Sequence, residues 1–329
     1  MKNFKKVIIW GFPLYSHTHS FVHAAWYKAF RSLGYETYWF HDKDFPLNFD
    51  YENTLFISEG YADSNIPINN TSTYIIHICK EPKKYLDKGA RLIDLRHNVK
   101  FIQDFSYDYS MDKNKMQKID EVSYYQKDAS DLALREKYRN NISGYEALYI
   151  SWATDLLPNE INFDDMNIKR NNDIYYIGSY WSANRLELEI FKNECLKNNI
   201  NFIVRDPWKE RTTFEENKRL VQTSYMAPDI RGSGVTCSEA IPEKCNHLSI
   251  GFIPCRTFKN ISYGQLGITN SPAVNELFNG RIIYNSNLSQ LFYDAKNNIQ
   301  NYELIREQME FVKNNHTYIN RINSILSII

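Results

Sequence analysis

The sequence predicts an α/β fold built from two tandem, doubly wound domains. Strand-like and helix-like segments alternate over most of the chain, which is typical of parallel sheets covered by helices. The alternation starts anew near residue 174, after a polar and aperiodic stretch. The length of 329 residues is sufficient for about two domains, each with its own core.

The N-terminal half begins with an expected βαβ unit. Val7–Trp10 is predicted as a strand, Phe21–Leu33 as a helix with Ser20 as its N-cap, and Tyr35–Phe40 as a second strand after Gly34. Three further strands are expected, at Thr54–Ser58, Tyr74–Cys79 and Ala147–Ser151. Residues 106–141 are polar and rich in tyrosine, and we expect helical pieces there.

The C-terminal half repeats this pattern. Its first βαβ unit is expected as strand Ile174–Ile177, loop Gly178–Ser182, helix Ala183–Lys197 and strand Asn201–Arg205. The later elements are predicted as helix Phe214–Gln222, strand Ser224–Pro228, helix Arg256–Tyr263, strand Gly267–Thr269, helix Ala273–Phe278, strand Arg281–Tyr284 and helix from Asn287 to the end. With Pro158–Asn172 as linker, the predicted parts are an N-terminal α/β domain at 1–165, a C-terminal α/β domain at 173–300 and a C-terminal helix at 301–329.

Composition narrows the partners. Lysine plus arginine equals aspartate plus glutamate, 39 each, so no overall field attracts nucleic acid or an anionic membrane. We therefore expect no nucleic-acid partner and at most peripheral membrane contact. No stretch reaches the length of a membrane span, no cleavage site follows the first apolar run, and the five cysteines form no CxxC pair. These features favour a cytoplasmic location.

Common nucleotide-binding motifs are missing. Neither expected first loop contains G-x-G-x-x-G, and no G-x-x-x-x-G-K-[ST] occurs. Hydride transfer and ATP hydrolysis are therefore disfavoured, and the most informative segment is Gly251–Ser271. Arg256 and Lys259 fall at the start of a predicted helix, where cations and free backbone N–H groups suit a diphosphate. Gly264 follows the helix, and Ser262 lies within reach of a ribose hydroxyl.

This segment resembles the donor-site element of GT-B glycosyltransferases, which runs Arg-x-Phe-Glu-x-x-Ala-x-Gly before a buried strand. The resemblance covers roughly Ile174–Phe292, and it departs from the pattern at Lys259, where many members carry glutamate. It implies GT-B architecture, in which an acceptor-side domain (1–165) and a nucleotide-sugar domain (173–300) face a cleft. It also implies a nucleotide-sugar donor. The alternative is that Arg256 and Lys259 only cap and solvate a helix.

The resemblance also implies further donor-side residues. Gly178-Ser-Tyr-Trp-Ser182 is similar to the glycine loop that approaches the donor phosphates, so Gly178 and Ser179 become candidates, with Arg185 in the next helical turn. Asn275 and Glu276 occupy positions where such proteins place donor-facing residues. The alternatives are an ordinary turn and a capping carboxylate.

The N-terminal half offers candidates for a general base. His19 follows the first strand, and Glu59 follows the third, where acceptor sites of the family lie. Their rivals, which the sequence does not separate from them, are His17, His23 and Asp63. His17-x-His19 could instead bind metal, but the sequence shows no third ligand. Asp42-Lys-Asp44 resembles the metal-binding DxD of GT-A enzymes, but falls too early and is expected to be a loop.

Together these features predict a metal-independent hexosyl- or related transferase of polysaccharide biosynthesis. It would move a sugar from a nucleotide-sugar donor to a glycan or lipid-linked hydroxyl. The nucleotide-sugar is a substrate, so no cofactor is expected. The alternatives are an epimerase-like two-domain sugar-nucleotide enzyme and a sugar-binding cleft protein.

Overall fold

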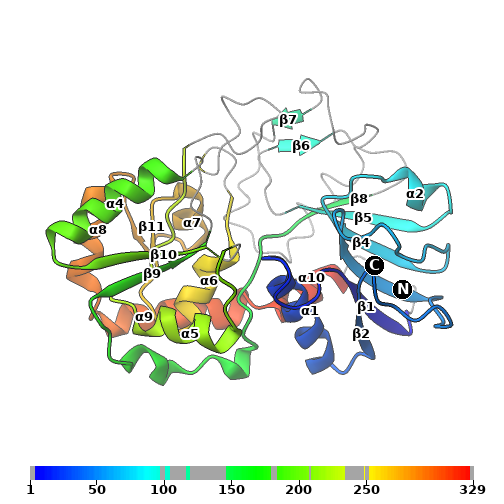
Figure 1. Ribbon diagram of the computed structural model, residues 1–329, viewed down its shortest axis with the longest axis horizontal. Helices are drawn as coiled ribbons and strands as arrows, with labels where there is room; N and C mark the ends of the chain where they lie inside the picture. The colour runs from blue at the N-terminus through cyan, green and yellow to red at the C-terminus, as the bar shows by residue number, and fades with distance from the viewer. Residues whose placement is uncertain are drawn as a thin grey trace. The chain divides into compact units, whose positions relative to one another are not determined.

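The structure is a computed structural model that describes residues 4–96, 101–103, 116–118, 146–178, 184–206, 209–233, 248 and 252–326. The chain folds into two compact units (Figure 1). Unit 1 comprises Met1–Val122, Asp128–Ser151 and Tyr318–Ile329, and unit 2 comprises Ser123–Lys127 and Trp152–Thr317. The ranges 1–165, 173–300 and 301–329 remain a prediction about domains that fold independently.

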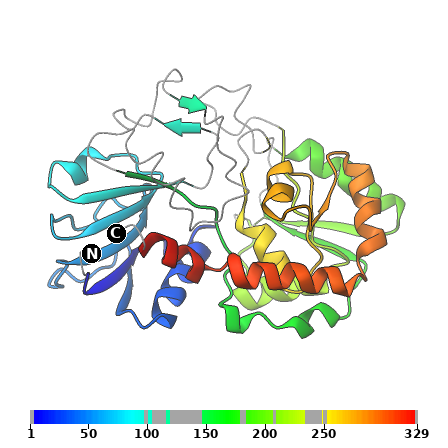
Figure 2. The same cartoon turned by 180° about the vertical axis from the view of Figure 1, so that it is seen from behind.

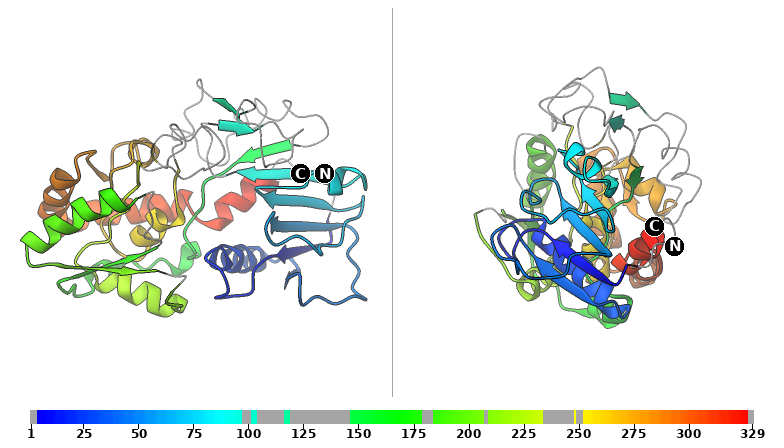
Figure 3. Two further views of the ribbon diagram at one scale, coloured as in Figure 1. Left: turned by 45° about the horizontal axis from the view of Figure 1, so that its top comes forward. Right: turned by 90° about the vertical axis from the view of Figure 1, so that its right-hand side faces the viewer.

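Unit 1 is built on a six-stranded parallel sheet in the order β2-β1-β3-β4-β5-β8 (Figure 3). The strands are β1 Lys6–Trp10, β2 Thr37–Phe40, β3 Thr54–Glu59, β4 Thr73–His77, β5 Arg91–Arg96 and β8 Glu146–Tyr149. Every residue of β1, β3 and β4 is buried, because helices and loops cover both faces of a parallel sheet. The chain order reverses at β1, which has β2 on one side and β3 on the other.

Helices α1 Ser20–Ser32 and α10 Tyr318–Leu326 pack against each other in unit 1 (Figure 2). Trp26 of α1 makes an edge contact with Tyr318, with ring centroids 4.8 Å apart. Arg321 is fully buried and donates to the carbonyl and the hydroxyl of Ser151, at 2.9 and 3.0 Å. These contacts assign the last helix to the N-terminal sheet. Unit 1 also contains α2 Lys83–Leu86 and the antiparallel pair β6 Phe101–Gln103 and β7 Met116–Lys118.

Unit 2 contains two short parallel strand pairs. β9 Asp173–Ile177 pairs with β10 Asn201–Arg205, and β11 Ile268–Thr269 pairs with β12 Ile283–Tyr284. The first pair lies between α4 Arg185–Lys197, which contacts β10, and α5 Phe214–Thr223, which contacts β9 (Figure 1). The other elements are η3 Pro158–Glu160, η4 Phe163–Asn167, α6 Cys255–Ser262, α7 Pro272–Leu277, α8 Leu288–Asn298 and α9 Tyr302–Asn315.

The predicted α/β class and its parallel sheets are confirmed. Three local predictions need correction. Ser20 is the first residue of α1 rather than its N-cap, which is His19, and the Ser20 hydroxyl accepts from the Tyr15 N–H at 3.0 Å. Ser224–Pro228 is not a strand; the chain forms only an isolated bridge, between Asp229 and Thr269. The C-terminal stretch is three helices, with α9 in unit 2 and α10 in unit 1. Residues 106–141 lie largely outside the described part of the chain.

Candidate functional site

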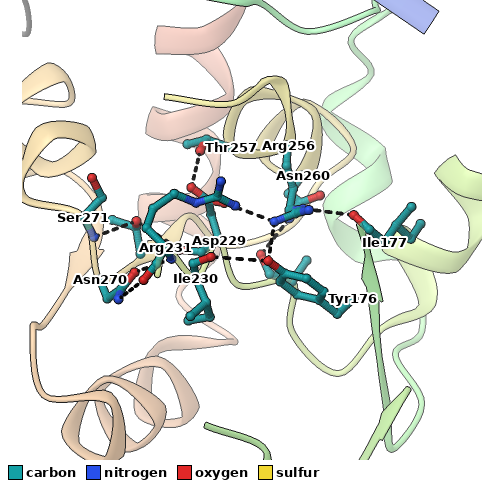
Figure 4. Close-up of polar contacts among 12 residues, drawn as sticks. Tyr176, Ile177, Asp229, Ile230, Arg231, Arg256, Thr257, Asn260, Asn270 and Ser271 are labelled. Carbon is teal, nitrogen blue, oxygen red and sulfur yellow. Dashed lines mark hydrogen bonds and ion pairs between the residues drawn. The ribbon is translucent and has the colours of Figure 1, made fainter. Parts of the chain in front are cut away.

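The predicted donor side of unit 2 centres on the carboxyl end of β9. Tyr176 and Ile177 close that strand, and Gly178 follows it. Arg256 reaches the same place from the first turn of α6, and Asp229 reaches it from the bridge to β11. Figure 4 shows the polar contacts that join these elements. The carboxyl ends of parallel strands are where ligands bind in α/β sheets.

Arg256 is held by the end of β9. Its Nε donates to the Ile177 carbonyl at 3.0 Å, and Nη1 donates to the Tyr176 hydroxyl at 2.6 Å. The guanidinium carbon also lies 4.2 Å from the centroid of the Tyr176 ring, within cation–π range. The side chain is 17% exposed, so it is largely but not completely shielded from solvent.

A second arginine shares the same carboxylate. Arg231 Nη2 donates to Asp229 Oδ1 at 2.5 Å, and Arg256 Nη1 lies 3.5 Å from that oxygen. The other oxygen, Oδ2, accepts from the Thr257 hydroxyl at 2.8 Å. Asn270 fixes the backbone of Arg231 in both directions, accepting from its N–H at 2.7 Å and donating to its carbonyl at 2.8 Å.

The charges of this cluster do not cancel among the residues that the structure describes. Two guanidinium groups face one buried carboxylate, which leaves one formal positive charge at the strand end. Burial acts to lower the pKa of Arg256, but Tyr176 and Asp229 outweigh it and raise that pKa, so the group stays charged. Within the described part of the chain, the buried Nε of Arg231 and the buried hydroxyl of Ser271 have no hydrogen-bond partner. Unsatisfied buried donors are costly and gain energy when a ligand oxygen accepts from them.

Gly178 is required by the position of Arg256. A Cβ built on this glycine would lie 1.8 Å from Nη2 and 2.9 Å from Cζ of Arg256. Since the guanidinium is anchored on Tyr176 and Ile177, it cannot give way without breaking those hydrogen bonds. The predicted pair of glycine loop and arginine is therefore in contact, although Ser179 lies outside the described residues.

Lys259, the other predicted phosphate cation, has a different environment. Its Nζ lies 2.9 Å from Asp155 Oδ2, and the Tyr263 hydroxyl donates to the same carboxylate at 2.6 and 2.7 Å. Burial lowers the pKa of Lys259, but Asp155 outweighs this and raises it. Among the residues that the structure describes, Asp155 matches the charge of Lys259, so this lysine adds no excess positive charge there.

Ser262 and Gly264 lie at the opposite end of α6 from Arg256. Ser262 is fully buried; its hydroxyl lies 2.7 Å from that of Thr154 and donates to the Lys259 carbonyl at 3.0 Å. A Cβ on Gly264 would meet the backbone of Asp165 and Met166 at 2.6 Å, and its φ is +91°. Both residues therefore pack and terminate the helix, as predicted for Gly264, and their contact with a nucleotide stays a prediction.

The remaining donor-side candidates lie around this centre. Arg185 is exposed at the first position of α4. Asn275 and Glu276 are half-buried in α7, the helix that follows Asn270 and Ser271. Direct contacts between these three side chains and the arginine cluster are not observed among the described residues.

The candidate bases of unit 1 meet at the edge of its sheet. His19 is the N-cap of α1, and Glu59 is the last residue of β3. The His19 Nδ1 lies 2.7 Å from Glu59 Oε2, with the imidazole N–H as donor. Burial acts to raise the pKa of Glu59, but its hydrogen bond with His19 and the nearby histidines outweigh burial and lower it. The two residues that the sequence singled out therefore form one hydrogen-bonded pair.

The rival candidates differ in their contacts, and His23 approaches the pair itself, with its Nε2 3.7 Å from Glu59 Oε2. His23 is buried, accepts from the Phe12 N–H at 3.1 Å, and has its pKa lowered to about 4, mainly by burial. Asp63 binds the Tyr85 hydroxyl and Lys84 Nζ, the latter at 2.8 Å. The rings of His17 and Phe12 stack with centroids 4.0 Å apart.

The Asp42-Lys-Asp44 segment is a loop, as expected. Asp42 accepts from the indole N–H of Trp10 at 2.9 Å and from the N–H groups of Ser64 and Asn65 at 3.0 Å. The Asp44 side chain is 89% exposed.

Sequence reasoning missed Asp229, Arg231 and Tyr176 in unit 2, and His77 in unit 1. Asp229 and Arg231 lie in a stretch without helix or strand periodicity. In such a stretch, the sequence pattern does not predict which side chains lie close to one another. Tyr176 falls within a predicted strand, and a tyrosine two residues before the strand-ending Gly178 is suitably placed to meet a ligand cation or base. His77 is the last residue of β4 and pairs with Glu59, the last residue of β3. A polar residue at the end of each of two neighbouring strands was the signal that could have predicted their proximity.

Comparisons with known proteins show structural likeness only. No family model matches the chain, and no curated protein matches it in sequence. The structure is similar to that of the T4 phage BGT with its UDP-glucose substrate, at 12% identity and a TM-score of 0.47, covering 98% of this chain and 96% of that one. It is similar to TarM at 11% identity and a TM-score of 0.45, covering 79% of this chain but spanning only 55% of TarM. An α1,3-fucosyltransferase gives 10% identity and a TM-score of 0.40, covering 98% and 88%. These neighbours are GT-B glycosyltransferases.

Proposed function

We propose that the protein is a glycosyltransferase whose unit 2 binds the diphosphate of a nucleotide-sugar donor. The observation that carries the proposal is the pair of arginines on one buried carboxylate. Arg231 and Arg256 are both bound to Asp229, and among the described residues they leave an excess positive charge at the carboxyl end of β9. A fixed, desolvated cation suits a leaving diphosphate, because the negative charge on the diphosphate grows as the glycosidic bond breaks.

The arginines are suited to this task by their rigidity. Guanidinium groups can make two parallel hydrogen bonds to phosphate, and orientation on Tyr176, Ile177 and Asp229 reduces the entropy lost on binding. Since Gly178 has no Cβ, the backbone after β9 can approach the same guanidinium. These groups would hold the phosphates without a metal ion, which keeps the prediction of metal-independent donor binding.

Acceptor activation belongs to unit 1 in this proposal. An imidazole bonded to a buried carboxylate is a common general-base arrangement, since the carboxylate orients the ring and stabilises its protonated form. The His19–Glu59 pair has this form, and His19 is 32% exposed on its side chain. The acceptor itself, a glycan or lipid-linked hydroxyl, stays a prediction from the sequence, as do the cytoplasmic location and a role in polysaccharide biosynthesis. Among the described residues, no helix combines the length and apolar character needed to cross a membrane.

The proposal is tested by a ligand series on the full chain. We expect calorimetric binding of nucleoside diphosphates, weaker binding of the monophosphates, and weakest binding of the nucleosides. Arg231→Gln should lower diphosphate affinity by about 10- to 100-fold, since a charge-assisted hydrogen bond contributes about 1.5–3 kcal/mol. Release of nucleoside diphosphate from a panel of nucleotide-sugars would then identify the donor. Equal affinity for nucleoside and diphosphate, in folded protein, would refute the phosphate site.

A further inference from the structure

A second cluster of chemically active side chains lies in unit 1, at the carboxyl end of its sheet. His19 is the N-cap of α1, the helix that follows β1, and Glu59 and His77 are the last residues of β3 and β4. β1, β3 and β4 are consecutive neighbours in the sheet, so these positions converge at one edge, where the strand order reverses. One ligand atom of each side chain lies within 4.8 Å of the other two.

We propose that His19, Glu59 and His77 bind a divalent transition-metal ion, for which zinc is the test ion. Two imidazoles and one carboxylate form a donor set of catalytic zinc sites, with a fourth position left open. Magnesium and calcium are disfavoured, because they prefer sites made of oxygen ligands, and this cluster supplies a single carboxylate. The sequence showed His19 without its partner ligands, because Glu59 and His77 are 40 and 58 positions away and only the strand order brings them together.

The spacing of the three ligands is close to what an ion requires. Ligands about 2.0–2.1 Å from a tetrahedral zinc lie about 3.3–3.4 Å from one another. The widest pair therefore needs to close by no more than about 1.5 Å. His19 Nδ1 and Glu59 Oε2, which lie 2.7 Å apart, need to separate by about 0.6 Å to share an ion. Side-chain rotation about χ1 and χ2 can supply both changes. For an ion to bind through His19 Nδ1, the imidazole must carry its N–H on Nε2, and the hydrogen bond to Glu59 Oε2 is replaced by the two bonds to the ion.

Backbone constraints hold the ligands in place. The Gly60 N–H donates to the His77 carbonyl at 3.0 Å and so joins the ends of β3 and β4. A Cβ on Gly60 would lie 2.1 Å from the Ile78 carbonyl oxygen, so only glycine allows this approach. Ile78 has a φ of +54°, which is unfavourable for a β-branched residue. Such strained residues are typically found at functional sites, and this one follows His77 directly.

Accessibility fits an ion with one open position. Glu59 and His77 are 3% exposed, whereas the His19 side chain is 32% exposed. An ion would therefore enter from the His19 side and could there bind water or a substrate hydroxyl, whose pKa it would lower. The inference uses unit 1 only, and it holds or fails independently of the phosphate site in unit 2. In a metal-loaded protein, the ion would replace the His19–Glu59 pair as the activator of a hydroxyl.

The test is metal titration of full-length protein that has been stripped with a chelator and dialysed. Zinc binding is measured by calorimetry, and cobalt binding by visible ligand-field absorption, which reports directly on coordination. We expect one zinc per chain at this site, and no comparable binding of magnesium. Since loss of outer-sphere support alone lowers metal affinity by about 10- to 100-fold, loss of a ligand in His19→Gln or His77→Gln should cost at least about 100-fold.

His41→Gln is the matched control. His41 also lies in unit 1 beside an acid, with Nε2 3.9 Å from Asp44, but outside the cluster, so this variant should bind zinc with wild-type affinity. Circular dichroism checks that each variant is folded, and the partly exposed His19 is the substitution least expected to disturb the core. Absence of a stoichiometric zinc site in the wild type, or wild-type affinity in folded His19→Gln, would overturn the inference and leave a metal-free His19–Glu59 pair.

Discussion

Arg256 and Lys259 look equivalent in the sequence but are predicted to behave differently on substitution. They lie one helical turn apart, and both side chains are 17% exposed. In the described part of the chain, Lys259 pairs with Asp155, whereas Arg256 shares Asp229 with Arg231, so that two cations face one carboxylate. We therefore expect Arg256→Ala to weaken nucleoside-diphosphate binding and Lys259→Ala to weaken the fold.

The magnitudes follow from the contacts. Removing the Arg256 side chain deletes a charge-assisted bond to phosphate worth about 1.5–3 kcal/mol, or about 10- to 150-fold in the dissociation constant. Lys259→Ala leaves the Asp155 carboxylate buried with only the Tyr263 hydroxyl among its described partners. Breaking one partner of a buried pair costs about 3–5 kcal/mol of unfolding free energy when the pair is fully buried. Because Lys259 is 17% exposed, we expect about 1–3 kcal/mol after solvent screening.

Two measurements separate the roles. Calorimetry gives the affinities for nucleoside diphosphate and for the bare nucleoside, and urea denaturation gives the free energy of unfolding. Arg256→Ala should lower the affinity for the nucleoside diphosphate and leave the affinity for the bare nucleoside unchanged. Arg256→Lys should restore only part of the diphosphate affinity, because an ammonium group cannot make the bidentate contact of a guanidinium. If folded Lys259→Ala loses diphosphate affinity as strongly as Arg256→Ala, the assignment of the cation to Arg256 alone is incorrect.

Three further predictions concern glycines and a buried thiol. Gly178→Ala should lower diphosphate affinity about tenfold or more in calorimetry, because the new Cβ would lie 1.8 Å from Arg256 Nη2 and would displace the guanidinium. Gly280→Ala is the control for backbone strain at positive φ, because no described atom lies within 4 Å of the Cβ it would add. Gly264→Ala should lower the unfolding free energy by about 1–3 kcal/mol without changing the relative affinities for diphosphate and nucleoside, since φ is +91° and the Cβ meets backbone. Burial raises the pKa of the Cys195 thiol from 9.0 to about 12, so the thiol stays neutral in the folded protein. The contribution of this neutral thiol to the free energy of unfolding is fully present below pH 9 and is lost as the pH rises toward 12. Cys195→Ala should therefore show a shallower alkaline decline in denaturation experiments, and an unchanged slope would contradict this.

The fold was predictable where local patterns determine it. The apolar run Val7–Trp10 and the helix after it have clear periodicity, and both are found within one residue of the predicted bounds. β5 escaped prediction because Arg91–Arg96 carries charged residues in a central strand. Its Asp94 is fully buried and accepts from the Cys79 N–H at 2.7 Å, a long-range contact that no local pattern records.

The candidate sites show the same limit more sharply. The sequence predicted roles for Arg256, Gly178, His19 and Glu59, each of which lies at or next to an end of a regular element. It could not identify the charge partners that decide their roles, because Asp229 and Asp155 lie in irregular segments 27 and 104 positions from their partners. Two cations in one helical turn are therefore ambiguous until their counter-ions are known. A lysine matched by its own carboxylate contributes to stability, whereas an arginine that shares a carboxylate with another arginine retains charge for a ligand.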